Sequence, residues 1–167
     1  GKPVMFEPRI YPYANLFPGF AVKPFITDFN KDGLNDIVIG ELNNELNYFQ
    51  NTGSITNPVF VSSVNNPPNS KNLGKIFSQQ NDYFSESGAP FFFEDKTGLN
   101  MLFGNQGGPV KLYAVTDNKP ETAFTLTDSQ IGNIFVGTRT VPALYDIDND
   151  GFYEMILGNE RGGISFY

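Results

Sequence analysis

The chain contains no cysteine, no histidine and no tryptophan. Without cysteine there is no disulfide and no thiolate chemistry, and without histidine the commonest general base and transition-metal ligand are missing. Zinc sites and Ser-His or Cys-His catalysis are therefore excluded. Basic residues are also few, with 11 Lys and Arg against 18 Asp and Glu, a net charge of −7. Because like charges repel, we expect no nucleic-acid partner and no anionic membrane surface.

Long hydrophobic runs are absent as well. No apolar stretch approaches the ~20 residues that span a bilayer, so we expect no direct membrane insertion. The first residues, Gly1-Lys2-Pro3, lack the apolar stretch of a signal peptide. Two explanations stay open, namely a leader removed during export or a chain that is part of something longer.

Aromatic and turn-forming residues are plentiful. The 167 residues include 17 Phe, 8 Tyr, 17 Gly and 12 Pro, and the glycines and prolines are scattered along the chain. Phe and Tyr favour pleated, half-buried surfaces, and scattered Gly and Pro punctuate many short elements. This composition predicts an all-β fold. A chain of this length supports a single core, so we expect one domain.

A repeated unit organises the chain. Residues 23–49 and 141–167 share a proline and a glycine at the same spacing, 40 − 24 = 16 and 158 − 142 = 16. Residues 89–113 form a weaker copy with a spacing of 104 − 90 = 14. The glycines recur after 104 − 40 = 64 and 158 − 104 = 54 residues, as in four-stranded propeller blades with long connections. The sequence thus predicts a partial β-propeller of about three four-stranded blades.

The predicted organisation is a single propeller segment over 1–167. It consists of the last strand of a preceding blade and a linker at 1–20, a blade with an acidic loop at 21–64, a long connection at 65–88, a degenerate blade at 89–128 and a blade with an acidic loop at 139–167. In the first blade we expect strands at 24–28, 36–41, 46–50 and 58–63. Three blades fall short of the usual 4–8. Either the chain belongs to a larger propeller, or several copies complete a ring.

Two loops carry the strongest local signal. Residues 28–36 and 146–154 both read D-x-[DN]-x-D-G-x-x-[DE], with oxygen-bearing side chains at positions 1, 3, 5 and 9 and a glycine at position 6. Hard oxygen ligands in this number suit Ca²⁺, which takes six to eight donors. We predict two Ca²⁺ sites, with the following ligands: Asp28, Asn30, Asp32, Asp36 and the carbonyl of Leu34 in the first, and Asp146, Asp148, Asp150, Glu154 and the carbonyl of Phe152 in the second.

These loops differ from an EF-hand. An EF-hand carries a bidentate Glu at position 12 and helices on both sides, whereas position 12 here is Ile39 or Leu157 and the flanking sequences are strand-like. The pattern therefore predicts strand-loop-strand calcium sites. The alternative is a pair of acidic hairpin turns that bind no metal.

The two acidic loops, the Val-Ile-Gly type strand and the segment Tyr48-Phe49-Gln50-Asn51-Thr52-Gly53 resemble FG-GAP or VCBS repeats, particularly those of secreted or surface proteins of Bacteroidetes. The resemblance implies a β-propeller, bound calcium, an extracellular or cell-surface location and a role in adhesion or glycan handling. The middle copy departs from the pattern, with Glu94-Asp95-Lys96-Thr97-Gly98 in place of the full loop. We predict that it binds no calcium and that Lys96 replaces the charge of the ion.

The expected function is a calcium-stabilised binding, adhesion or structural scaffold with a protein or glycan ligand, and not an enzyme. Acidic residues outside the loops are scattered without the pairing that glycoside hydrolysis needs. The glycine-rich segments 104–108 and 158–163 lie between strands, without a helix N-terminus to hold a phosphate. Two alternatives remain: the propeller part of a secreted polysaccharide-degrading enzyme, and a component or cargo of a bacterial outer-membrane secretion complex.

Overall fold

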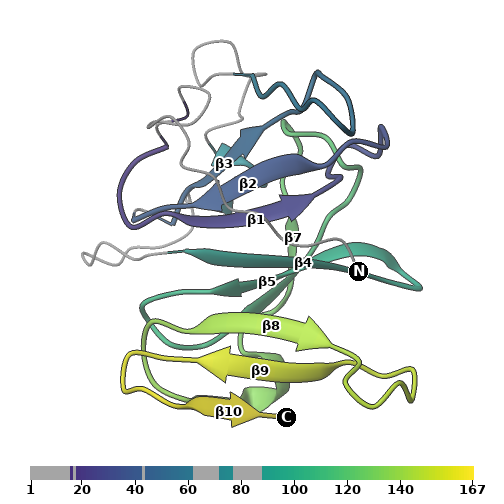
Figure 1. Ribbon diagram of the computed structural model, residues 1–167. Coiled ribbons are helices and arrows are strands. Elements are labelled where there is room, and N and C mark those ends of the chain that lie inside the picture. Colours follow the sequence, from purple (N-terminus) through teal and green to yellow (C-terminus); the bar gives the residue numbers. More distant parts are fainter. Residues whose placement is uncertain (1–15, 17, 43, 62–71, 77–87) are drawn as a thin grey trace.

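Short β-strands make up almost all of the regular structure. The computed structural model describes residues 16, 18–42, 44–61, 72–76 and 88–167 (Figure 1). The strands are β1 (Lys23–Thr27), β2 (Asp36–Gly40), β3 (Leu46–Phe49), β4 (Ala89–Asp95), β5 (Gly98–Gly104), β6 (Lys111–Ala114), β7 (Thr125–Asp128), β8 (Val141–Tyr145), β9 (Glu154–Gly158) and β10 (Ile164–Phe166), with a 3₁₀ turn, η4 (Ile131–Asn133), between β7 and β8. The expected all-β class is confirmed.

The strands form three antiparallel sheets, in the orders β1-β2-β3, β4-β5-β6-β7 and β10-β9-β8. We call them the first, middle and third sheets. Strands β1, β2 and β3 lie where strands were predicted. The strand expected at 58–63 is reduced, within its described part, to a single antiparallel bridge between Phe60 and Asn51. Among the described residues, only the middle sheet has the four strands expected of every unit.

The middle sheet is covered on both faces. Side chains alternate along a strand, so neighbouring residues of β4 enter different cores. Phe92, Met101 and Tyr113 join the core shared with the first sheet. Phe91 and Leu102 join the core shared with the third sheet. The run Phe91-Phe92-Phe93 is therefore explained by burial on two sides.

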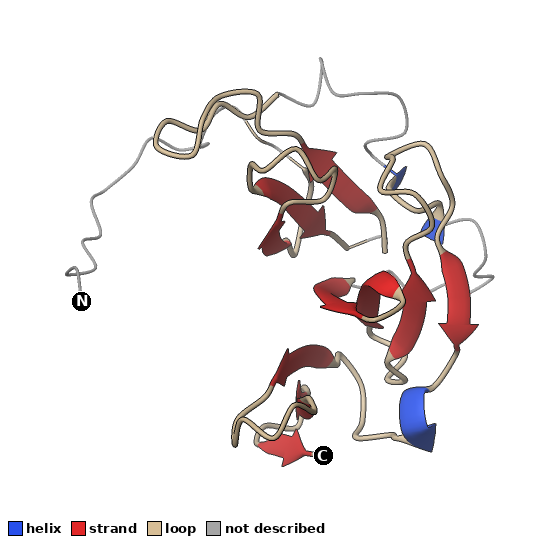
Figure 2. Cartoon of the chain, turned by 90° about the vertical axis from the view of Figure 1, so that its right-hand side faces the viewer, coloured by secondary structure: helices blue, strands red, loops and turns tan. Residues whose placement is uncertain are grey.

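The three sheets follow one another along a curve, as Figure 2 shows. Strand β1 packs against β4, and β4 packs against β8, so the first strands of consecutive sheets are neighbours (Figure 1). The acidic loops connect the first and second strands of the first and third sheets. Stacking in this order places the two loops on either side of the hairpin turn between β4 and β5.

No structure was predicted for the connection at 65–88, of which the structure describes residues 72–76 and Gly88. Leu73 is fully buried in the core between the first and middle sheets, and its N–H donates to the carbonyl of Leu46 at 3.0 Å. Gly74 forms a parallel bridge with Ala123. This segment thus joins the edge of the first sheet to the residues before β7.

The strand predicted at the start of the 1–20 segment, at residues 2–6, lies outside the described residues. Within the part of the chain that the structure describes, no helix has the length and apolar character needed to cross a bilayer.

Candidate metal centres

The two acidic loops have the same backbone conformation. The fourth position is left-handed in both, with φ of 62° at Lys31 and 60° at Asn149. The sixth position is also left-handed, with φ of 87° at Gly33 and 91° at Gly151. No described atom lies within 4 Å of a Cβ built on either glycine. Glycine is therefore required at position 6 for the sharp turn and not for lack of space.

Side-chain oxygens hold the first loop in its curve. The two oxygens of Asp28 accept hydrogen bonds from the N–H groups of Asp32, at 3.1 Å, and Gly33, at 3.0 Å. Oδ1 of Asn30 accepts from the same N–H of Asp32 at 3.2 Å. Asp32 in turn accepts from the N–H of Leu34 at 2.9 Å. The amide of Asn30, which donates to Asp32 at 2.9 Å, is the main cause that lowers the pKa of the Asp32 carboxyl.

The second loop repeats this pattern position by position. Asp146 accepts from the N–H groups of Asp150, at 3.1 Å, and Gly151, at 3.0 Å. Asp148 accepts from the N–H of Asp150 at 3.2 Å, and Asp150 accepts from the N–H of Phe152 at 2.8 Å. Two sequences that share their oxygen-bearing positions and the glycine at position 6 therefore adopt one loop structure, which orients the carboxylates in the same way twice.

Position 9 distinguishes the loops, and Asp36 occupies it in the first. Its side chain is fully buried. Oδ2 accepts from the N–H of Phe29 at 3.2 Å and from the hydroxyl of Tyr48 at 2.9 Å, and Oδ1 accepts from the N–H of Asn51 at 2.8 Å. Burial raises the pKa of Asp36, and it also raises the pKa of Tyr48, with the charge of Asp36 adding to that shift. Asp36 therefore fixes the loop to the sheet, and its role as a calcium ligand stays a prediction.

In the second loop, position 9 is Glu154, which is partly exposed. Its Oε2 accepts from the N–H of Ile147 at 2.6 Å, the counterpart of the Phe29 bond. The ligand atoms of Asp146, Asp148 and Glu154 all lie within 4.8 Å of one another. In the described part of the chain this is the only cluster of three or more acidic side chains that could hold a metal ion.

The donor set of this cluster fits a hard cation. Its three carboxylates offer oxygen only, which suits Ca²⁺ or Mg²⁺, and the larger ion tolerates irregular geometry and several carboxylates. Asp150 lies at position 5 of the same loop. Phe152 and Leu34 lie at position 7, where each donates its N–H to the position-5 aspartate. Ligation by their carbonyl groups stays a prediction.

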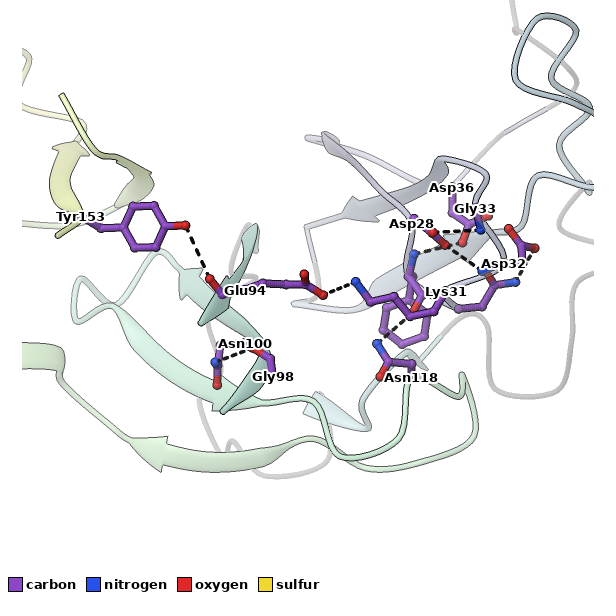
Figure 3. A network of polar contacts seen from close by, with 12 residues as sticks. Asp28, Lys31, Asp32, Gly33, Asp36, Glu94, Gly98, Asn100, Asn118 and Tyr153 are labelled. Atoms are coloured by element: carbon purple, nitrogen blue, oxygen red, sulfur yellow. Dashed lines mark hydrogen bonds and ion pairs between the residues drawn. The ribbon is translucent and has the colours of Figure 1, made fainter. Parts of the chain in front are cut away.

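The middle unit has a two-residue hairpin turn in place of the loop, with Asp95 paired to Gly98. Asp95 accepts a hydrogen bond from the N–H of Thr97 at 2.7 Å. Lys31 of the first loop also brings a positive charge to this hairpin, because its Nζ pairs with Glu94 (Figure 3). Among the described ion pairs, none involves Lys96.

Glu94 also contacts the third unit. The hydroxyl of Tyr153 lies 3.5 Å from the carbonyl oxygen of Glu94, and the rings of Tyr153 and Phe93 meet edge to face at 6.1 Å. Figure 3 shows Glu94 between Lys31 on one side and Tyr153 on the other. The middle hairpin therefore connects the two acidic loops.

Sequence reasoning missed the partners of Asp36. Tyr48 and Asn51 were noted only as part of a repeat pattern, yet both donate to its carboxylate. Oδ1 of Asn51 also accepts from the N–H groups of Gly53 and Val59, at 3.0 Å each. A signal was available, since position 48 is Tyr while the matching residue of the last copy is Phe166.

No protein-family model, curated protein or solved structure matches this chain. The resemblance to FG-GAP or VCBS repeats therefore remains a prediction from the residues themselves.

Proposed function

We propose that this chain is a calcium-stabilised segment of an extracellular β-propeller that acts as a binding or structural scaffold. The observation that carries the proposal is the convergence of Asp146, Asp148 and Glu154 within 4.8 Å, in a loop whose conformation the first unit repeats. Three carboxylates this close repel one another, and a divalent cation removes that repulsion.

The order of the sheets supports the propeller. Consecutive antiparallel sheets with neighbouring first strands are the arrangement of propeller blades. One close contact between them also recurs, because Gly40 lies against the proline of the middle unit as Gly104 lies against the proline of the third. A repeated interface of this kind relates the three units by one repeated step.

The nature of the ligands supports calcium outside the cell. Modules that bind Ca²⁺ with dissociation constants of about 10⁻⁴–10⁻³ M are extracellular, where calcium reaches such concentrations. The second loop is mostly exposed, and the carboxylates of its cluster come from one nine-residue loop, which fits a weak site of this kind. Two bound Ca²⁺ ions would change the net charge from −7 to −3, since −7 + 4 = −3.

Two features of the chain support a scaffold role. The acidic residues that converge belong to the metal loop, and the chain has no histidine to act as a base. Loops at the edges of the sheets are then available to a protein or glycan ligand, as loops on rigid scaffolds commonly are.

Calorimetric titration with CaCl₂ tests the metal site. We expect binding to the chelator-treated protein, and Glu154→Gln should weaken it because one carboxylate of the cluster is lost. Glu121→Gln is the matched control, since Glu121 is an exposed acidic residue outside both loops. Absence of binding heat in millimolar calcium, or equal weakening by the two variants, would contradict the proposal.

A further inference from the structure

The chain contains two Asp-Gly pairs, and both lie in the acidic loops. Asp32-Gly33 and Asp150-Gly151 occupy positions 5 and 6 of the first and the second loop. All four residues are exposed to solvent. No described atom lies within 4 Å of a Cβ built on either glycine, so no neighbouring side chain covers them.

An exposed Asp-Gly pair isomerises slowly without an enzyme. The backbone nitrogen of the glycine attacks the side-chain carboxyl carbon of the aspartate. A C–N bond forms, the C–O bond breaks, and the carboxyl hydroxyl leaves as water with the proton of the N–H group, which gives a cyclic succinimide. Water then opens one of the two C–N bonds of this ring. One opening restores aspartate, and the other gives isoaspartate, in which the main chain runs through the former side chain.

Both loops restrain the attacking nitrogen in the same way. The N–H of Gly33 donates to Asp28 at 3.0 Å, and the N–H of Gly151 donates to Asp146 at 3.0 Å. The reaction needs the loss of this proton, so the folded loops slow it equally at this step. Any difference between the two pairs must come from the aspartate that is attacked.

In the first loop this aspartate is held by both of its oxygens. Oδ1 of Asp32 accepts from the N–H of Leu34 at 2.9 Å, and Oδ2 accepts from the side-chain amide of Asn30 at 2.9 Å. To approach the nitrogen of the next residue, the carboxyl group would have to break one or both bonds. The first pair is therefore protected twice.

In the second loop the matching aspartate is held by one oxygen. Oδ1 of Asp150 accepts from the N–H of Phe152 at 2.8 Å, and within the described part of the chain no donor reaches Oδ2. The reason is the residue at position 3, which is Asp148. An ionised carboxylate only accepts hydrogen bonds, and its charge repels that of Asp150. The carboxyl group of Asp150 is therefore freer to turn toward the nitrogen of Gly151.

We propose that Asp150 is a site of spontaneous isomerisation to isoaspartate, and that the residue at position 3 makes it react faster than Asp32. Isomerisation adds one carbon atom to the main chain between Asp148 and Glu154. It therefore separates two carboxylates that the loop brings together with Asp146. Loss of calcium affinity in the isomerised chain rests on the proposed function, whereas the reaction itself does not.

Ageing the protein near neutral pH tests the proposal, with chelator present and below the melting temperature. Peptide mapping with electron-transfer fragmentation locates isoaspartate at each position. We expect it to accumulate about tenfold faster at Asp150 than at Asp32, the factor given by one missing hydrogen bond. In guanidinium chloride the two rates should be equal, because the unfolded chain keeps neither loop. Both sites are compared within one molecule.

Exchanging the residues at position 3 tests the cause. Asp148→Asn supplies an amide donor and should slow the reaction at Asp150. Asn30→Asp removes the donor and should accelerate the reaction at Asp32. Glu121→Gln is the matched control, since it removes an exposed charge outside both loops and should change neither rate. Circular dichroism confirms that each variant is folded.

Equal rates at the two aspartates of the folded chain would overturn the proposal, and so would a faster reaction at Asp32. Exchange variants that react like the wild type would also overturn it. A parallel incubation with calcium tests the proposed function, because a bound ion would hold Asp150 and slow its isomerisation. An unchanged rate in calcium would count against the metal site alone, so the two proposals fail separately.

Discussion

Tyr48 donates a hydrogen bond of 2.9 Å from its hydroxyl to Oδ2 of Asp36 inside the first unit. The carboxylate of Asp36 accepts two further bonds, from the N–H groups of Phe29 and Asn51. A buried charge is tolerated only where hydrogen bonds replace its water. One aspartate therefore connects the start of the acidic loop, strand β3 and the residues that follow β3.

Truncating this network should destabilise the fold. We expect Tyr48→Phe to lower the free energy of unfolding by about 1.5–3 kcal/mol, because a bond to a buried charge is lost. Asp36→Ala should cost more, since it leaves three donors without their acceptor. Urea denaturation measures both. Tyr153→Phe is the control: its hydroxyl is exposed and 3.5 Å from its acceptor, so the change should stay within about 0.5 kcal/mol. Equal effects of the two tyrosine substitutions would contradict the assignment.

Calcium should stabilise the chain mainly through the second loop. At a hundredfold excess over the dissociation constant, one site adds about 2.7 kcal/mol. Asp146→Ala should remove most of the rise in melting temperature that calcium produces, because it breaks the cluster with Asp148 and Glu154. Asp28→Ala should remove less, since the matching acid of the first loop, Asp36, is held in the interior. The check is differential scanning calorimetry with calcium and with chelator. If Asp28→Ala removed more of the calcium-dependent rise in melting temperature than Asp146→Ala, the first loop and not the second would be the main calcium site.

The succession of strands along each unit could be predicted, because the repeat is visible in residues that are close together in the sequence. Each copy begins with a proline in its first strand and ends its second strand with glycine, and turn residues bound every run. The long connection could not be predicted, because the burial of Leu73 depends on Leu46, far away in the sequence. The reduction of the strand predicted at 58–63 could not be foreseen for the same reason. These residues have a strand-like composition, yet the structure pairs Phe60 with Asn51 in a single bridge.

For the candidate site, the sequence predicted two equivalent loops, and their backbones are indeed equivalent. It also treated position 9 as a ligand in both. The two residues at position 9 differ in length and in their partner. Asp36 is short and accepts a hydrogen bond from the hydroxyl of Tyr48. Glu154 is longer, and the residue that matches Tyr48 is Phe166, which has no hydroxyl. Tertiary partners of this kind are invisible to a local motif.

The contribution of the middle hairpin to the stability of the fold should depend on pH and not on calcium. The hydroxyl of Thr97, followed by its N–H, lowers the pKa of Asp95. A carboxyl whose pKa is lowered by folding stabilises the folded state at pH values above its unfolded pKa of about 3.9. This stabilisation disappears as the pH falls through the pKa of the folded state. Thr97→Ala should therefore be less stable than wild type near pH 7, and the difference should vanish in acid. Melting curves across pH measure this. A difference that changes on adding chelator would show a metal at this turn.

The three matching glycines should respond differently to one added methyl group. In Gly104→Ala the methyl would meet Pro142 and the carbonyl of Thr140, and overpacking of this kind costs about 1–3 kcal/mol. Gly158→Ala meets no described atom and removes backbone freedom from the unfolded chain, so the monomer should gain about 0.5 kcal/mol. Gly40→Ala should follow Gly104→Ala, because Pro90 takes the place of Pro142. Urea denaturation compares the three. If Gly158→Ala were as destabilising as Gly104→Ala, contact with the next unit would not explain the cost of the added methyl group at Gly104.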